Sequence, residues 1–274
     1  MALQHSPQID ETAIVAKMDF CIPGEKVIFY PADRARSRWP YRPHEVKIYD
    51  ARAVKDQLDL ERSGFVLVER ESAVENFYDP EEVERVYIPE VTALVQELTG
   101  ADKVITFGTM VRSSAADKQG HLPAFGAHVD YGDRTVREYA RRVLGDEEAE
   151  RWLRGRYVLI NVWRPIKTVY SAPFAVCDAS TVAASDLNDS EVHGGLGDPN
   201  RPPLYGYSVS FNPNQRWYYV PEMRPDEVLV FKLFDSDSAR VQWTAHSAFE
   251  HPHTRPDAPP RESIEIRTIS FFAP

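Results

Sequence analysis

The sequence predicts a mainly β fold with flanking helices, arranged as an antiparallel sandwich or barrel with the helices packed outside it. Two observations lead to this prediction. Amphipathic helical patterns end before residue 156, and from Arg156 onward the chain consists of short segments rich in β-branched and aromatic residues. These segments are separated by Pro, Asn, Asp and Gly, which favour turns. The chain shows no internal repeat and no interdomain linker, so residues 1–274 are expected to form a single domain.

The first 45 residues are irregular and rich in proline and charge. They contain one apolar stretch, Lys26–Tyr30, and the run Arg34–Pro40 is typical of a chain laid over a core rather than of a core strand. We therefore expect residues 1–45 to form an extended N-terminal arm. Such an arm could exchange between two copies, which makes a homodimer possible.

The clearest helix is predicted to follow Asp79. Asp79 suits the N-cap because its carboxylate can accept hydrogen bonds from free backbone N–H groups, and Pro80 suits the first helical position. Apolar residues recur on one face of this segment up to Gly100, a residue type that commonly ends helices. Pro89 lies inside the pattern, so a kink or a break into two helices is expected there.

A second helical region is expected between Arg134 and Leu153, with Gly145 as an internal stop. The polar stretch between Asp178 and Pro203 is predicted to be a long loop, which in a compact domain usually has a function or is mobile. The predicted strands are Gly64–Glu69, Arg156–Trp163, Pro173–Cys177, Tyr205–Phe211, Arg216–Val220, Glu227–Phe234 and Glu262–Phe271.

Composition and charge exclude several classes of protein. The net charge of −10 provides no basic surface for a nucleic acid, and no run of about 18 apolar residues is present that could span a membrane. The two cysteines, Cys21 and Cys177, cannot build a disulfide framework and match no zinc motif. They suit a reducing compartment, and the N-terminus lacks the pattern of a signal peptide, so a cytoplasmic protein is expected.

His128 and Asp130 form the first candidate site. In an extended strand residues i and i+2 point to the same face, so these two side chains project together while Val129 faces away. One imidazole and one monodentate carboxylate can share a metal ion. A third ligand from a neighbouring strand would complete a facial triad with three open positions, which is typical of non-haem Fe(II) sites that bind a co-substrate and dioxygen.

The third ligand is expected to be a distant histidine. His246 stands among small and aromatic residues and is one candidate. His251 and His253 flank a proline in a proline-rich stretch that is typical of a solvent loop. The remaining candidates are His121 and His193, of which His193 lies beside two glycines in the predicted long loop and is better suited to a substrate contact.

A polar row on the last predicted strand is the second candidate site. By strand alternation Arg261, Ser263, Glu265 and Arg267 share one face. The guanidinium of Arg261 and the hydroxyl of Ser263 could together hold a carboxylate. Arg267 is the alternative, and it could instead pair with Glu265 or bind an acidic substrate. The two arginines lie about 20 Å apart by strand rise, so both cannot hold one small carboxylate.

A series of short motifs follows the chain in order, from about Val46 to Phe272. They are His-Val-Asp-Tyr (128–131), Val-Trp-Arg-Pro-Ile (162–166), Phe-Ala-Val-Cys-Asp (174–178), Trp-Tyr-Tyr (217–219), Asp-Glu-Val-Leu-Val-Phe-Lys (226–232), Thr-Ala-His-Ser-Ala-Phe (244–249) and Arg-Glu-Ser-Ile-Glu-Ile-Arg (261–267). This order resembles the small non-haem iron and 2-oxoglutarate oxygenases of secondary metabolism. The resemblance is to the group related to the cephalosporin 7α-hydroxylase component and to fungal gibberellin desaturase-like proteins.

The resemblance implies a double-stranded β-helix, a jelly-roll and cupin-like core, that binds Fe(II), 2-oxoglutarate as co-substrate and dioxygen. Carried over by position, it implies His128, Asp130 and His246 as metal ligands. It also implies that Arg261 and Ser263 hold the far carboxylate of 2-oxoglutarate. The implied activity is oxidation of a small-molecule secondary metabolite by hydroxylation, desaturation, cyclisation or endoperoxide formation.

Two residues of one predicted strand are further candidates for co-substrate contacts. Asn161 could donate to the metal-bound end of the co-substrate. Arg164 could bind the co-substrate or an anionic group of the substrate, or it could form an ion pair, for example with Asp178 or Asp235.

Two alternative functions stay open at this point. One is an iron oxygenase or isomerase that does not use 2-oxoglutarate, in which Arg261 is structural. The other is a non-catalytic β-helix that acts as an accessory or binding subunit.

Overall fold

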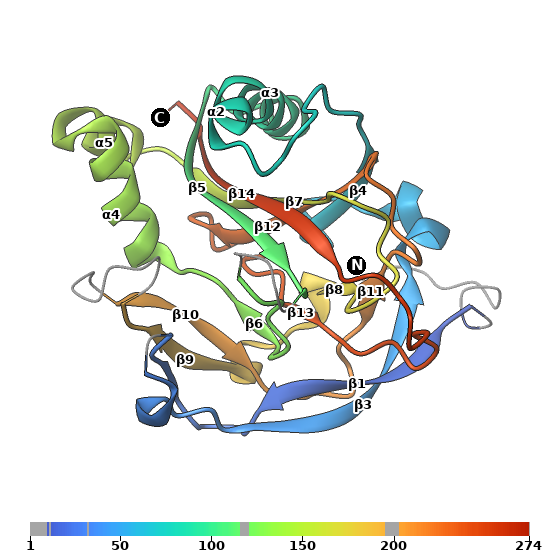
Figure 1. The fold of residues 1–274 in the computed structure, drawn as a ribbon. Coiled ribbons are helices and arrows are strands. Elements are labelled where there is room, and N and C mark those ends of the chain that lie inside the picture. Colours follow the sequence, from blue (N-terminus) through green and yellow to red (C-terminus); the bar gives the residue numbers. More distant parts are fainter. Residues whose placement is uncertain (1–9, 11, 32, 116–120, 195–202, 274) are drawn as a thin grey trace.

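Two β-sheets face each other and enclose much of the apolar core (Figure 1). The computed structural model describes residues 10, 12–31, 33–115, 121–194 and 203–273. Within these ranges the larger sheet has nine strands in the order β1-β3-β11-β8-β13-β6-β10-β9-β2, and the smaller sheet has five in the order β4-β12-β7-β14-β5. The prediction of a mainly β fold with flanking helices is confirmed.

The strands of the larger sheet are β1 (Ile14–Cys21), β2 (Val27–Phe29), β3 (Tyr41–Asp50), β6 (His128–Val129), β8 (Phe174–Cys177), β9 (Leu187–Val192), β10 (Leu204–Val209), β11 (Trp217–Tyr219) and β13 (His246–Ala248). Those of the smaller sheet are β4 (Phe65–Glu69), β5 (Lys103–Ser113), β7 (Tyr157–Pro165), β12 (Glu227–Asp235) and β14 (Glu262–Phe271). The α-helices are α2 (Pro80–Glu82), α3 (Ile88–Thr99), α4 (Asp133–Leu144) and α5 (Asp146–Trp152).

Every predicted strand is present, with boundaries that agree to within two residues. The structure adds β5, which the sequence analysis missed although its β-branched residues are a strand signal. A register shift in the pairing of β5 with β14 marks a β-bulge, and a bulge interrupts the simple alternation of side chains that reveals a strand.

The helix predicted after Asp79 is confirmed. The Asp79 carboxylate accepts from the backbone N–H groups of Glu81 and Glu82, and Gly100 ends α3 with a φ of 66°. The expected irregularity at Pro89 is a π-helical turn over Val83–Tyr87, directly before α3, so the chain stays helical through this segment. No helix in the described ranges is long and apolar enough to cross a membrane.

The second helical region also divides as predicted, because Gly145 separates α4 from α5 with a φ of 79°. A left-handed φ of this kind is accessible to glycine without the steric cost that a side chain brings.

The expectation of an extended N-terminal arm over residues 1–45 is wrong for most of that segment. Strand β1 pairs with β3 in antiparallel register from Ile14 with Ile48 to Cys21 with Tyr41, and β3 continues the larger sheet by pairing with β11. These strands bury Ala16, Met18 and Phe20 against the sheet, so the segment belongs to the core of its own chain. The structure therefore does not support the expected homodimer through an exchanged arm. Residues 1–9 of the predicted arm lie outside the described residues.

The expectation of one long loop between Asp178 and Pro203 is also wrong in part. Strand β9 lies inside this stretch and pairs with β10 on one side and with β2 on the other. Its sequence, Leu-Asn-Asp-Ser-Glu-Val, is polar because the strand lies near the edge of the larger sheet, where side chains reach solvent on one face. Residues 195–202 of the predicted loop lie outside the described residues.

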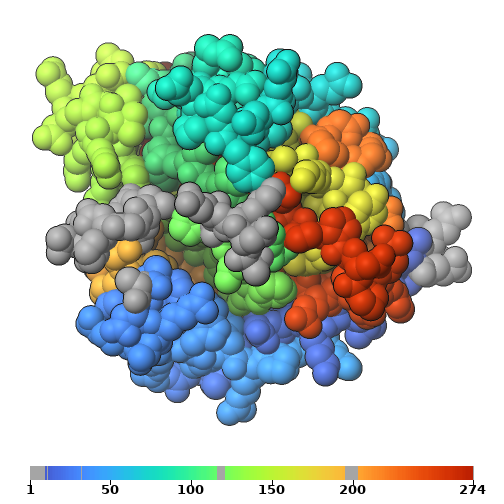
Figure 2. All heavy atoms as spheres, in the orientation of Figure 1, coloured from blue at the N-terminus to red at the C-terminus, as the bar shows by residue number. Residues whose placement is uncertain are grey.

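The smaller sheet is covered on both faces. Its inner face carries Trp163, Leu229 and Phe231, which pack in one cluster with Tyr218 of the larger sheet. Its outer face carries aliphatic residues such as Ile264, which pack in a second cluster with α3. Figure 1 shows α2 and α3 above β14, and Figure 2 shows the side chains of this helical segment spread over that side of the molecule. A side chain on β7 or β14 therefore reaches the space between the sheets only at every second position.

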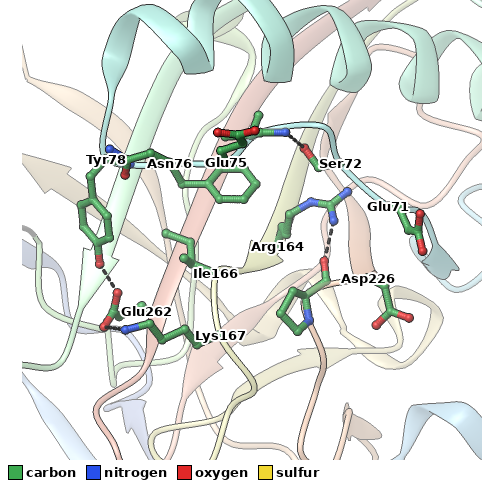
Figure 3. A pocket seen from close by; sticks show the side chains of 13 residues that line it. Glu71, Ser72, Glu75, Asn76, Tyr78, Arg164, Ile166, Lys167, Asp226 and Glu262 are labelled. Carbon is green, nitrogen blue, oxygen red and sulfur yellow. Dashed lines mark hydrogen bonds and ion pairs between the residues drawn. The ribbon is translucent and has the colours of Figure 1, made fainter.

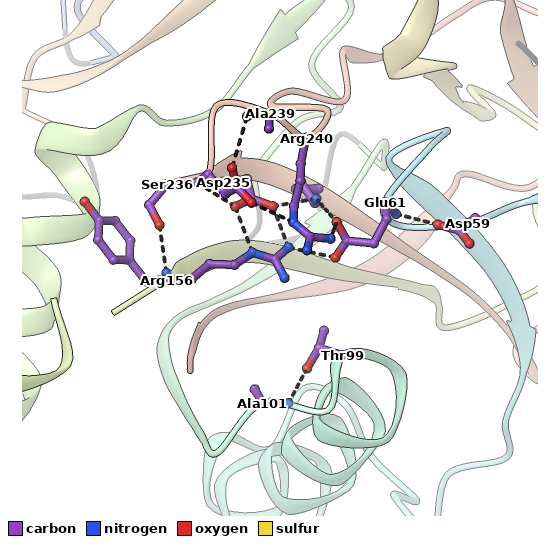
Figure 4. A network of polar contacts seen from close by, with 12 residues as sticks. Asp59, Glu61, Thr99, Ala101, Arg156, Asp235, Ser236, Ala239 and Arg240 are labelled. Carbon is purple, nitrogen blue, oxygen red and sulfur yellow. Dashed lines mark hydrogen bonds and ion pairs between the residues drawn. The ribbon is translucent and has the colours of Figure 1, made fainter. Parts of the chain in front are cut away.

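A buried ion network joins β12 and β7 to the turn before β4 (Figure 4). Lys232, which is 1% exposed, donates to Asp235 at 2.7 Å and to Glu61 at 3.2 Å. Arg156 donates to the same two acids, at 2.6 Å and 2.7 Å. Each buried charge of this network has an opposite charge in contact, which is the condition under which proteins bury charge without a large loss of stability.

Candidate metal centre

His128, Asp130 and His246 meet on neighbouring strands of the larger sheet, on the side that faces the smaller sheet. Strand β6 carries His128 and leads into Asp130, and the register of β13 with β6 pairs His246 with His128. One possible ligand atom from each side chain lies within 4.8 Å of the other two. Among the described residues this is the group of His, Cys, Asp and Glu side chains that could hold a metal ion.

Backbone carbonyl groups orient both imidazoles. Nδ1 of His128 lies 2.7 Å from the carbonyl oxygen of Gly126, and Nδ1 of His246 lies 3.0 Å from that of Thr244. Because a carbonyl oxygen only accepts, each Nδ1 carries a proton, and in a neutral imidazole this leaves the lone pair on Nε2. The two Nε2 atoms face Asp130, at 3.5 Å from Oδ1 for His128 and at 4.0 Å from Oδ2 for His246. This tautomer is the one that a metal ligand requires.

His246 occupies the closed side of the centre. It is 3% exposed, and its ring lies 4.9 Å from the ring of Phe231 and 5.6 Å from that of Phe174, measured between centroids. Burial, with the neighbouring His128, lowers the pKa of His246 to about 4, so the imidazole is neutral at physiological pH. The side chain of His128 is 21% exposed, which places the open side of the centre at His128.

Gly206 allows the neighbouring strand to pass close to Asp130. A Cβ atom at position 206 would lie 2.5 Å from the carbonyl oxygens of Val129 and Asp130. Because those atoms belong to the backbone, a larger residue at this position would displace the strand that carries the two candidate ligands.

A guanidinium from the smaller sheet holds Asp130. Arg267 on β14 donates from Nε and Nη2 to Oδ2 of Asp130, at 3.1 Å and 3.0 Å. Burial acts to raise the pKa of Asp130, but the charge of Arg267 holds that pKa well below its ordinary range. The carboxylate is therefore ionised, which is the state in which it can bind a metal.

The charges continue beyond Arg267. Glu265 accepts from Arg267 at 2.8 Å and from Arg112 at 2.9 Å on the same oxygen, Oε1, and its other oxygen lies 3.5 Å from Nδ2 of Asn161. The pairing of Arg267 with Glu265 that the sequence allowed is therefore present. Arg112 was missed, because it lies on the unpredicted strand β5.

Arg261 and Ser263 lie at the other end of the polar row that contains Glu265 and Arg267. Both have hydrogen-bond donors that are not used within the described residues. Both are buried, at 2% and 1% exposed. Arg261 donates from Nη1 to the carbonyl oxygen of Ala172 at 2.8 Å, whereas its Nε and the Oγ of Ser263 have no hydrogen-bond partner among the described residues. Burial, with the positive charge of Arg112, lowers the pKa of Arg261 to about 9. A buried cation of this kind, with no carboxylate in the described ranges at ion-pair distance, fits an anionic ligand.

Asn161 and Arg164 of β7 point to opposite sides. Asn161 faces Glu265, and its Oδ1 has no partner in the described part of the chain. Arg164 lies on the outer face, where it donates to Tyr87 and to the carbonyl oxygen of Pro225 and lines a surface cavity of about 500 Å³ (Figure 3). The expected contact of Arg164 with the co-substrate is therefore wrong. The expected ion pair with Asp178 or Asp235 is also absent from the described contacts, because the alternation of the strand turns the side chain away.

The competing histidines have other surroundings. His193 stacks on Tyr30 with 4.6 Å between centroids, and its Nε2 lies 3.0 Å from Glu191. His251 lies 3.3 Å from the hydroxyl of Tyr219, next to the exposed His253, and both line a second surface cavity of about 550 Å³. His121 follows a segment outside the described residues and pairs with Arg112 through a β-bridge.

The chain is similar to proteins of described activity. The family model described as an oxidoreductase/YMDC permease-like domain matches residues 21–271. A dioxygenase of Aspergillus novofumigatus, described as the Fe(II)/2-oxoglutarate-dependent dioxygenase NvfI, is 35% identical over 87% of this chain and 87% of its own. A hydroxylase/desaturase of Hormonema carpetanum is 30% identical over 86% of each chain.

A solved structure of the iron and α-ketoglutarate-dependent endoperoxidase NvfI superimposes with a TM-score of 0.86, at 32% identity, over 96% of this chain and 99% of that one. The match confirms the expected jelly-roll core. It also favours the 2-oxoglutarate-dependent activity over the two alternative functions. The chain belongs to the Fe(II)- and 2-oxoglutarate-dependent dioxygenases that oxidise small molecules in secondary metabolism.

Proposed function

We propose that His128, Asp130 and His246 are the iron ligands of this dioxygenase. Their convergence within 4.8 Å is the observation that carries the proposal. Two imidazoles whose Nε2 atoms face the centre and one carboxylate form the donor set that non-haem Fe(II) prefers, and they leave three coordination positions open. The chemistry of the donor set therefore fits iron.

We further propose that Arg261 and Ser263 hold the far carboxylate of 2-oxoglutarate. The support is the buried Nε of Arg261 and the buried hydroxyl of Ser263, which have no partner among the described residues. A carboxylate between them would satisfy both donors and would compensate the charge of the guanidinium. The stacking of Arg261 over Trp163, at 5.6 Å from the ring centroid, limits its movement and prepares this site for its ligand.

When bound, Fe(II) and 2-oxoglutarate supply the oxidising chemistry, in which dioxygen is reduced while 2-oxoglutarate is decarboxylated to succinate. The residues of the chain bind and orient these groups. Phe174 and Phe231 exclude water from the side of His246, and the carbonyl groups of Gly126 and Thr244 keep both imidazoles in the required tautomer. The position of the substrate relative to the centre then decides which bond is oxidised.

We also propose the cytoplasm as the site of action. Cys21 and Cys177 are buried and unpaired, and burial raises the pKa of both thiols. Free buried thiols of this kind are typical of proteins in a reducing compartment.

The test of the ligand set is the substitution Asp130→Ala. It is expected to reduce bound Fe(II) and the formation of succinate at least about 100-fold, because two neutral imidazoles alone hold the ion weakly. Asp189→Ala removes an exposed carboxylate from β9 of the same sheet and is the matched control, with wild-type values expected for both quantities. Unchanged iron content and unchanged succinate formation in Asp130→Ala would contradict the assignment.

A further inference from the structure

A chain of alternating charges runs from β5 through β14 and ends on Asp130. Its members are Arg112, Glu265, Arg267 and Asp130, and each contacts the next at 3.0 Å or less. We propose that Arg267 is a positioning residue that restricts Asp130 to metal binding through one oxygen, Oδ1, and that Glu265 holds Arg267 in place. This inference rests on the proposed ligand set and assigns a function to a charge pair outside it.

The hydrogen bonds of Asp130 distinguish its two oxygens. Nε and Nη2 of Arg267 both donate to Oδ2, at 3.1 Å and 3.0 Å. Oδ1 instead faces Nε2 of His128 at 3.5 Å. An oxygen that accepts two charge-assisted hydrogen bonds has both lone pairs occupied, so Oδ1 is the oxygen that is free to bind a cation.

One-oxygen binding has a consequence for the reaction. An octahedral ion has six positions, and the proposed ligands take three of them if the carboxylate binds through a single oxygen. The keto acid end of 2-oxoglutarate would take two more, and one would remain for dioxygen. A carboxylate that bound through both oxygens would take that last position. By holding Oδ2, Arg267 would keep this last coordination position open.

The surroundings of Arg267 keep its guanidinium fixed. The side chain is 5% exposed, and its guanidinium lies 5.3 Å from the ring centroid of Tyr131. Oε1 of Glu265 accepts from Arg267 and is itself held by two donors of Arg112, at 2.9 Å and 3.2 Å. Because two acids alternate with two arginines, the group is neutral as a whole, and Arg267 has no uncompensated charge that would draw it toward another anion.

The substitution Arg267→Lys tests the proposal, because lysine keeps the charge but loses the planar fork that reaches one oxygen with two donors. Co(II) is the probe, since its visible absorption reports both its affinity and its coordination. We expect the affinity for Co(II) to fall about 10- to 100-fold, as is typical when a residue that orients a ligand is changed, and the absorption spectrum to change. The dissociation constant of 2-oxoglutarate, measured at saturating metal, should stay within about threefold of wild type, because the distant Arg261 holds its carboxylate.

Arg164→Lys is the matched control. Arg164 is equally buried and lies on the neighbouring strand, but it faces away from the centre, so its variant should keep the Co(II) affinity and spectrum of wild type. Glu265→Gln is the second variant, which keeps Arg267 and weakens its anchor. An intermediate loss of Co(II) affinity is expected for it. If Arg267→Lys does not fold, the Co(II) affinity of Glu265→Gln tests the positioning role of Arg267 instead.

Two results would overturn the proposal. One is an unchanged Co(II) affinity and spectrum in the folded variant. The other is an unchanged metal affinity with loss of 2-oxoglutarate binding, which would make Arg267 the clamp for the co-substrate. A failure of the ligand set itself is seen separately, because Asp130→Ala would then keep its metal whatever the Arg267 variants do.

Discussion

The two ends of the polar row on β14 present the same side chain in opposite electrostatic surroundings. At one end Arg267 lies between the carboxylates of Asp130 and Glu265. At the other end Arg261 has no carboxylate at ion-pair distance among the described residues, and its Nε lacks a partner. Both arginines are buried, at 4% and 2% exposed, so neither is compensated by water.

The difference separates a buried cation that is compensated within the chain from one that is not. Burying a charge is costly unless an opposite charge and hydrogen bonds compensate it. Arg267 meets that condition within the chain, as do Lys232 and Arg156 in the network of Figure 4. Arg261 has no such partner among the described residues, and under the proposed function a bound carboxylate compensates it. Burial alone therefore does not identify a binding residue, whereas burial without a counter-charge does.

Unfolding in urea should give opposite results for the two arginines, and this is the largest effect we expect. Arg267→Met leaves Asp130 as a buried carboxylate without its guanidinium, so the free energy of unfolding of the metal-free protein should fall by about 3–5 kcal/mol. Arg261→Met removes an uncompensated buried charge, so the same quantity should rise by about 1 kcal/mol. Equal losses of stability in both variants would remove the distinction between the two ends.

For binding of 2-oxoglutarate, the change at Arg261 should have a larger effect than the change at Arg267. Arg261→Met is expected to raise its dissociation constant on the order of 100-fold, because two charge-assisted hydrogen bonds to the far carboxylate are lost. An anaerobic titration of the Fe(II) protein, followed by the visible charge-transfer band of the iron chelate, measures this. Arg164→Met provides the control, since that arginine lies on the outer face of the same sheet. Wild-type affinity in Arg261→Met would show that the clamp lies elsewhere.

Ser263→Ala should give a smaller change confined to binding. Loss of one hydrogen bond to a charged carboxylate should weaken 2-oxoglutarate binding about tenfold. The free energy of unfolding should stay within about 0.5 kcal/mol of wild type, because the hydroxyl that is removed is buried and has no partner among the described residues. The same titration and the same urea experiment check both values. A large loss of stability would mean that the hydroxyl already has a role in the folded chain.

Between the two ends of the polar row, acidic pH should change the free energy of unfolding only through the end at Glu265 and Arg267. This is the smallest effect we expect. Burial acts to raise the pKa of Glu265, but Arg112 and Arg267 lower it below its ordinary value of 4.5. Since the folded pKa lies below the unfolded one, the carboxylate stabilises the fold fully above about pH 4.5 and loses that contribution as the pH falls through the folded value. Glu265→Gln should therefore lose stability less steeply than wild type below pH 4.5 in urea titrations, and Arg261→Met should keep the wild-type slope.

Strand periodicity accounts for the features of the centre that local sequence could predict. His128 and Asp130 share a face because they stand two residues apart, and the polar row from Arg261, just before β14, to Arg267 shares a face for the same reason. The cap at Asp79 and the stop at Gly100 are equally local, and both were predicted correctly. The strands that were missed include β9, which is polar because it lies near a sheet edge, and β5, which contains a bulge.

The sequence by itself determined which side chains could act together on one strand, since the backbone repeats every two residues regardless of the rest of the fold. Only the tertiary structure decided which arginine would be paired. Asp130 and Arg267 are 137 positions apart and meet because the two sheets face each other, and no local pattern encodes a contact across that gap. The same packing turned Arg164 outward and left Arg261 buried with no carboxylate from the described part of the chain at ion-pair distance. The electrostatic difference between the two ends of the polar row is therefore a property of the assembled sheets.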